Sequence, residues 1–346
     1  MKITKPHLAQ LLILPKLLPV LGHQNINCMK TINSLLVISV SVLMYACNTN
    51  SHDNQKKKEF IYLNYTEAGI DSAYDQSYWA PNRELVFDQL QALQTLSQKE
   101  IGDPERIQYG DTEAEQLDLY RPNRKNAPIH IHIHGGAWRG GNGFGLKAYN
   151  ARKFIERGVM YIAPDYQLAT DANGSLNPMV EQLRNAVVWT YQNASKFGGN
   201  PESIYISGHS AGGHLGGVLI TTNWQEYNIP DNVIKGAFLS SGMYDLHPVS
   251  LSSRNEYVSF TEQMIDDYSP INHIDKLNTP VMLAYGTEES PEFQRQTEEF
   301  ARLLKEQSKE VELYVLEGYN HFEIIIALGN PYNLPGELMI KQMGIK

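Results

Sequence analysis

Short apolar runs alternate with helical patterns along most of the chain. Between the apolar runs, hydrophobic residues recur at helical spacing, most clearly over 179–197 and over 291–307, which opens at Pro291. This repeated order predicts an α/β fold with a mostly parallel central sheet and helices on both faces. The runs rich in β-branched and aromatic residues predict strands at 116–120, 129–134, 159–163, 204–207, 236–240, 281–285 and 311–316.

The segment 60–100 precedes the first predicted strand and has a different pattern. It is polar and helical in character, with aromatic residues at Tyr74, Tyr78 and Trp79. We interpret it as a small N-terminal helical cap that lines the way into a site. Because no linker, repeat or low-complexity tract follows, we expect residues 60–346 to form a single domain.

The first 47 residues differ from the rest of the chain. An apolar run from Leu35 to Ala46 ends at Cys47, and a polar stretch follows it. This run of about 12 residues is shorter than the roughly 20 that span a bilayer as a helix. The pattern predicts a targeting segment at 1–47, of the signal-peptide type, and a polar tether at 48–59.

The segment Leu43–Cys47 resembles a bacterial lipoprotein cleavage site, in which the cysteine is acylated and becomes the new N-terminus, although Met44 and Tyr45 depart from the usual pattern. We therefore expect export to the periplasm or the outer surface, with a lipid anchor on Cys47. A soluble exported protein, cleaved after Ala46, is the alternative. Our hypothesis is that translation starts at Met29, because the apolar patch before it would duplicate a complete signal.

Composition narrows the class of protein. Acidic residues outnumber basic ones by 38 to 29, which gives a net charge of -9 and argues against a general affinity for nucleic acid. The two cysteines, Cys28 and Cys47, lie in or beside the targeting segment. The mature domain is therefore expected to have no disulfide framework and no thiolate metal site, and to depend on its core for stability.

The pentapeptide Gly208–Gly212 has the form G-x-S-x-G. It follows the apolar run 203–207 and precedes a segment of small residues at 214–219. A strand, a sharp turn and a helix form the context in which such a serine becomes an exposed nucleophile. Ser210 is the predicted nucleophile.

An activated serine also needs a base and an orienting acid, which α/β-hydrolases supply in the chain order serine, acid, histidine. His321 follows the last predicted strand and is the candidate base. The acid is expected after the preceding strand, where Glu289 is favoured. Glu288 beside it and Asp245, after an earlier strand, are the alternatives.

Backbone donors for the oxyanion are expected after an earlier strand, where the chain reads H-G-G-A-W from His134 to Trp138. Glycine lets backbone N–H groups approach a substrate without obstruction. Gly135, Gly136 and Ala211, the residue after the nucleophile, are the predicted donors. This chemistry requires no metal and no organic cofactor.

Four other histidines lie in or near these motifs. His130 and His132 alternate with isoleucines on a predicted strand. We interpret them as structural residues and not as metal ligands. His209 and His214 flank the nucleophile in sequence and are second choices for the base.

Taken together, these motifs resemble the hormone-sensitive-lipase-like α/β-hydrolases over roughly residues 108–325. The H-G-G-x-W motif and the segment 290–296 are similar to those of arylformamidases (kynurenine formamidases) and their carboxylesterase relatives. The resemblance implies serine hydrolysis with the acid at Glu289, where those formamidases usually carry aspartate. Gln167 replaces the arginine that is common in the D-Y-R-L-A form of the segment 165–169.

Two substrate classes compete at this point. An exported enzyme meets external carboxylic esters, so we expect ester hydrolysis, and an N-formyl aromatic amide is the alternative. A rival from another class is a surface lipoprotein that keeps the hydrolase fold for binding alone. The sequence predicts a small-molecule partner and leaves the oligomeric state open.

Overall fold

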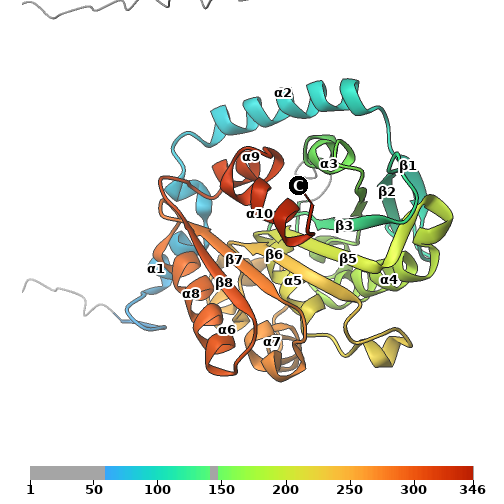
Figure 1. Ribbon diagram of the computed structural model, residues 1–346. Coiled ribbons are helices and arrows are strands. Elements are labelled where there is room, and N and C mark those ends of the chain that lie inside the picture. The colour runs from blue at the N-terminus through green and yellow to red at the C-terminus, as the bar shows by residue number, and fades with distance from the viewer. Residues whose placement is uncertain (1–58, 141–146, 346) are drawn as a thin grey trace, which may run out of the picture. The chain divides into compact units, whose positions relative to one another are not determined.

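The apolar runs of the sequence form an eight-stranded sheet in the computed structural model, which describes residues 59–140 and 147–345 (Figure 1). The strand order is β1-β2-β4-β3-β5-β6-β7-β8, and the strands from β4 to β8 in that order run parallel. The predicted mostly parallel sheet is therefore confirmed. The strands are β1 (Glu105–Gln108), β2 (Gln116–Tyr120), β3 (Ala127–Ile133), β4 (Met160–Pro164), β5 (Gly199–His209), β6 (Ile234–Ser240), β7 (Val281–Gly286) and β8 (Val311–Leu316).

Strand β1 was not predicted from the sequence. It is short and mostly exposed, and it pairs antiparallel with β2 alone at the sheet edge. An edge strand held by backbone hydrogen bonds needs no apolar alternation, so its sequence carries no strand pattern. The other seven strands match the predicted runs, and β5 extends further in both directions than the run 204–207.

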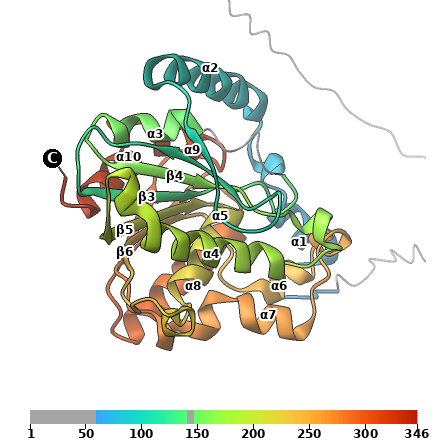
Figure 2. The same ribbon diagram turned by 90° about the vertical axis from the view of Figure 1, so that its right-hand side faces the viewer.

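Helices cover both faces of the sheet, as Figure 2 shows. One face carries α4 (Asn177–Asn193), α5 (Ala211–Ile220) and α8 (Pro291–Glu306), which bury the larger apolar core against the strands. The other face carries α3 (Lys147–Ile155), α9 (Glu323–Gly329) and α10 (Leu334–Gln342), around a second apolar cluster. This two-faced burial explains why the central strands read as nearly continuous apolar runs.

The segment before β1 is helical, as predicted for a cap. It contains α1 (Glu67–Tyr74), a 3-10 turn at Gln76–Trp79 and α2 (Arg83–Ile101). Helix α2 lies outside α3 and α9 and contacts both (Figure 1). Val86 and Leu90 bury its inner side in a small apolar cluster.

Short helices and 3-10 turns complete the described chain. The loop after β6 carries α6 (Leu246–Ser250), a 3-10 turn at Ser253–Glu256 and α7 (Glu262–Tyr268). Helix α8 begins where the sequence predicts, with the Ser290 side chain accepting from the Phe293 N–H and proline in the first turn. This fixed start positions the loop just before α8.

The compact unit that holds the sheet spans Lys56–Lys346. The predicted targeting segment 1–47, with Cys47 and Met29, lies outside the described residues, as does nearly all of the predicted tether. Within the described residues, no helix combines the length and the apolar character that crossing a bilayer requires.

Candidate active site

Ser210 lies at the sharp turn between β5 and α5. Its backbone has φ 58° and ψ −125°, a conformation that side-chain-bearing residues rarely adopt. A Cβ atom on Gly208 would lie 2.0 Å from the Gly212 carbonyl oxygen, and one on Gly212 would lie 2.1 Å from the carbonyl oxygen of Ile133. Only glycine fits at both positions, so the G-x-S-x-G spacing follows from the packing of this turn.

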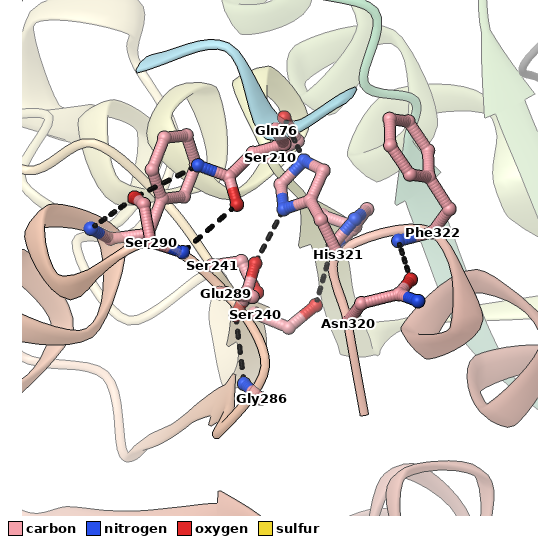
Figure 3. A network of polar contacts seen from close by, with 12 residues as sticks. Gln76, Ser210, Ser240, Ser241, Gly286, Glu289, Ser290, Asn320, His321 and Phe322 are labelled. Atoms are coloured by element: carbon pink, nitrogen blue, oxygen red, sulfur yellow. Dashed lines mark hydrogen bonds and ion pairs between the residues drawn. The ribbon is translucent and has the colours of Figure 1, made fainter. Parts of the chain in front are cut away.

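His321 contacts both other members of the predicted triad, as Figure 3 shows. Its Nε2 lies 2.9 Å from the Ser210 Oγ, and its Nδ1 lies 2.5 Å from Oε1 of Glu289. These residues come from the turn before α9, the end of β5 and the loop after β7. The fold therefore brings together three side chains that are far apart in sequence, with the mutual distances that proton transfer from a serine requires.

The carboxylate of Glu289 is held at both oxygens. While Oε1 faces His321, Oε2 accepts from the Ser241 hydroxyl at 2.8 Å and from the Gly286 N–H at 2.7 Å. The side chain is fully buried. A carboxylate fixed in this way orients the imidazole ring and can stabilise positive charge on it.

The two alternative acids lie elsewhere. Glu288 is exposed to solvent on the same loop. Asp245 caps α6, where its carboxylate accepts from the His247 N–H at 2.9 Å. Neither contacts His321, so the geometry favours Glu289 as the orienting acid.

Burial controls the ionisation of the histidine–carboxylate pair. Desolvation lowers the pKa of His321, and the positive charge of Arg254 adds to this effect. Burial also raises the pKa of Glu289, against the opposing effects of His209 and of the hydrogen bonds from Gly286 and Ser241. A neutral His321 that donates from Nδ1 to Glu289 has a free lone pair on Nε2 for the serine proton.

The H-G-G-A-W loop passes directly beside the nucleophile. A Cβ atom on Gly135 would lie 3.2 Å from the Ser210 Cβ and 2.7 Å from the His209 carbonyl oxygen. Within the described residues, the turn and loop hydrogen bonds include none donated by the N–H groups of Gly135, Gly136 or Ala211. Gly135 and Gly136 line the same cavity as Ser210, and Ala211 is the first residue of α5.

His134 and Trp138 support this loop from behind. The His134 ring stacks on Tyr166 at 4.3 Å, and the Tyr166 hydroxyl donates to the His134 carbonyl at 2.7 Å. Trp138 is buried, and its Nε1 donates to Nδ1 of His214 at 3.1 Å. Both motif residues thus hold the backbone of the loop in position.

The second choices for the base are engaged elsewhere. His214 is held between Trp138 and the carbonyl of Tyr268, which lies 2.8 Å from its Nε2. His209 packs its ring 4.4 Å from the His321 ring and contacts the Ser240 hydroxyl at 3.0 Å. His321 therefore remains the candidate base.

The strand histidines behind the site share one partner. Both His130 and His132 contact the Ser207 hydroxyl, at 2.7 and 2.8 Å. In the part of the chain that the structure describes, no group of three or more His, Cys, Asp or Glu residues is arranged to hold a metal ion.

A cavity of about 710 Å³ opens onto Ser210 and His321. Its walls include the oxyanion loop, the cap residues Tyr74 and Gln76, and Arg254. Sequence reasoning noted Tyr74 as part of a cap but missed Gln76 and Arg254. No motif marks either position, because their place at the site depends on how the cap and the loop after β6 fold over the sheet.

Comparisons with known proteins identify the family of this chain. A family model described as BD-FAE matches residues 117–245. Kynurenine formamidase of Danio rerio is 30% identical over 291 residues, covering 80% of this chain and 96% of that protein. Kynurenine formamidase of Salmo salar is 34% identical over 250 residues, covering 69% of this chain and 81% of that protein.

The fold has solved counterparts as well. The crystal structure of a putative thioesterase from Silicibacter sp. superposes with a TM-score of 0.66 at 21% identity, covering 78% of this chain and 98% of that chain. This likeness concerns the fold, and the two formamidases carry the relationship in sequence. The chain therefore belongs to the α/β-hydrolase family of the arylformamidases and their carboxylesterase relatives.

Proposed function

We propose that this protein is a serine hydrolase that cleaves a carboxylic ester through an acyl-enzyme, with Ser210 as nucleophile, His321 as base and Glu289 as orienting acid. The observation that carries the proposal is the position of His321. One imidazole nitrogen reaches the serine hydroxyl at 2.9 Å while the other is bound to a buried carboxylate. An imidazole held between a serine hydroxyl and a buried carboxylate, at the edge of a cavity, is the arrangement that general-base activation of the serine requires.

The proposed reaction has two halves. Ser210 Oγ attacks the ester carbonyl as His321 takes its proton, and the N–H groups of Gly135, Gly136 and Ala211 bind the oxyanion. The tetrahedral intermediate then expels the alcohol, which takes the proton from His321, and the acyl group remains on Ser210. Water attacks this acyl-enzyme with the same base, which releases the acid and restores the serine.

A second substrate class is supported by the relatives. The two formamidases match most of their own length, which favours hydrolysis of an N-formyl aromatic amide as the alternative. The ester remains the first choice because we also propose that residues 1–47 direct export and that Cys47 is acylated. An exported enzyme would meet external esters.

The test combines active-site labelling with turnover. A fluorophosphonate probe should attach to Ser210 in the folded protein, and Ser210→Ala should abolish both the adduct and nearly all turnover. A panel of short aryl esters should be hydrolysed faster than N-formylkynurenine. A strong preference for the formamide would replace the ester by the second candidate, and a folded protein without an adduct on Ser210 would favour a binding module.

A further inference from the structure

Arg254 is a buried cation in the wall of the cavity that contains Ser210. It lies in the 3-10 turn Ser253–Glu256, and only 7% of the residue is exposed. Its Nη2 donates to the carbonyl of Tyr74 at 2.9 Å. Its Nε and Nη1 are buried and have no hydrogen-bond partner among the described residues.

Among the described residues, no carboxylate forms an ion pair with this guanidinium. The ion pairs of the described residues do not include Arg254. Its guanidinium lies 5.3 Å from the ring centre of Trp138 and 5.9 Å from that of Tyr74. These ring faces attract the charge but accept no strong hydrogen bond, and arginine does not deprotonate to escape burial. A buried charge without a partner is strongly unfavourable, so the position calls for a compensating anion.

Among the described residues, the rest of the cavity wall supplies no ion-pair partner for Arg254. Arg83 and Arg139 also line the cavity, and the ion pairs of the described residues include neither of them. The carboxylates in the wall, Asp75 and Glu256, are on exposed residues. Among the described residues that line the cavity, three arginines stand against two acids on exposed residues, and the further carboxylate near the nucleophile, Glu289, is bound to His321.

A bound anion would also assist the chemistry. During attack by Ser210, His321 becomes positively charged. The uncompensated charge of Arg254 opposes this change, since the two cations repel each other. A substrate anion on Arg254 would cancel the repulsion, so that substrates with such a group gain in the transition state as well as in binding.

We propose that Arg254 binds a carboxylate of the substrate, and that this enzyme prefers esters or amides that carry a carboxylate in addition to the scissile carbonyl. The inference rests on the proposed function, because it assigns the substrate class of the same cavity. Arg254 then acts as a specificity-determining residue, and the planar guanidinium suits a carboxylate better than a point charge would.

Matched substrates test this at pH 8 in the purified full-length protein. In the first pair the charge is on the acyl side, 4-nitrophenyl hydrogen glutarate against its methyl ester. In the second pair it is on the leaving group, 4-acetoxybenzoate against 4-acetoxybenzamide. In at least one pair we expect kcat/KM to be at least about tenfold higher for the substrate that carries the carboxylate than for its neutral partner. This ratio corresponds to the free energy of one charge-assisted hydrogen bond.

Variants separate specificity from folding. Arg254→Met should remove the preference, chiefly by raising KM for the carboxylate substrate of each pair relative to its neutral partner. Arg254→Lys should retain part of the preference. Arg302→Gln is the matched control, because Arg302 lies on the exposed side of α8, paired with Glu299 and Glu306. It should behave as the wild type.

The outcomes are distinguishable. If the wild type hydrolyses the neutral esters at least as well as both carboxylates, the proposal is overturned while serine hydrolysis stands. If no ester is turned over and Ser210 takes no fluorophosphonate, both proposals fail. Should Arg254→Met not fold, inhibition of the wild type decides the matter: benzoate must compete with a neutral ester where benzamide does not, and equal behaviour of the two overturns the proposal.

Discussion

The most informative single residue for the proposed chemistry is Glu289, because the sequence left three acids open. Its carboxylate is buried against His321 and held by Ser241 and Gly286, whereas Asp245 caps a helix. We expect Glu289→Gln to lower kcat by on the order of 10³ to 10⁴, because the amide cannot hold the required tautomer or stabilise the imidazolium. Steady-state hydrolysis of a neutral aryl ester measures this.

Asp245→Asn is the matched control for that experiment. It removes a carboxylate that caps α6 and does not contact His321, and should change kcat only slightly. Near-native turnover in Glu289→Gln, together with inactivity in Asp245→Asn, would show that the acid has been assigned to the wrong loop.

The pH dependence of the reaction depends on Arg254. Protonation of the His321–Glu289 pair inactivates the base, and the positive charge of Arg254 lowers the pKa of His321 by repelling the added proton. Removing that charge favours the protonated form, so Arg254→Met should shift the acid limb of the kcat/KM profile to higher pH. The pH profile of kcat/KM for a neutral ester between pH 4 and pH 9 measures the shift. An acid limb that stays in place or moves to lower pH would contradict the prediction.

At the scale of elements, the contact between α3 and α9 contains a buried lysine. Lys153 is 1% exposed, its Nζ donates to the carbonyl of Leu328 and lies 4.6 Å from the ring centre of Phe154. Burial holds the pKa of Lys153 well below its ordinary value. The folded protein therefore binds a proton at this lysine less readily than the unfolded chain does.

This difference makes stability depend on pH. Because the unfolded chain binds more protons below its ordinary lysine pKa, the free energy of unfolding should rise with pH, by up to about 1.4 kcal/mol per pH unit from this group. Lys153→Met should be more stable than the wild type at pH 7, and its advantage should shrink towards pH 10. Urea unfolding between pH 7 and pH 10 checks this, with Lys196→Met at an exposed lysine as control. A constant difference across this range would contradict the assignment.

The contrast between elements fixed by local sequence and elements fixed by distant contacts explains which parts of the site could be predicted. The turn from β5 into α5 and the glycine loop after β3 are local: their backbone conformations need glycine, so the sequence displays them. Strand β1 pairs with the nearby strand β2, but its mostly exposed residues show no apolar alternation. Gln76 contacts Ser290 at 2.9 Å between their side chains, although 214 positions separate them in the chain. No local pattern encodes such pairs.

At the scale of the whole molecule, the compact unit Lys56–Lys346 has its own core on both faces of the sheet. We expect a chain that begins at Lys56 to fold and to retain the kcat/KM of the longer protein, since the proposed site is built from residues after 70. Activity and thermal unfolding of both forms measure this, and loss of the fold in the shorter form would contradict it.

The anchoring proposal has a separate test. In the native cell, Cys47→Ala should abolish incorporation of labelled palmitate and release active enzyme from the membrane fraction. Labelling that persists in Cys47→Ala, or an unlabelled wild type, would leave the soluble exported protein as the alternative.

The sequence by itself determined seven of the eight strands and their alternation with helices, the α/β-hydrolase fold, and the candidate nucleophile, base and oxyanion loop. These features are readable because they depend on short-range physics: apolar periodicity, the glycines of a strained turn, and the chain order that a serine hydrolase requires. Only the tertiary structure shows which of the three candidate acids contacts His321, since this depends on which loop lies beside that histidine. It alone also showed Arg254 in the wall of the cavity with no ion-pair partner among the described residues, because the charges around a cavity come from distant segments brought together and are not visible along the chain.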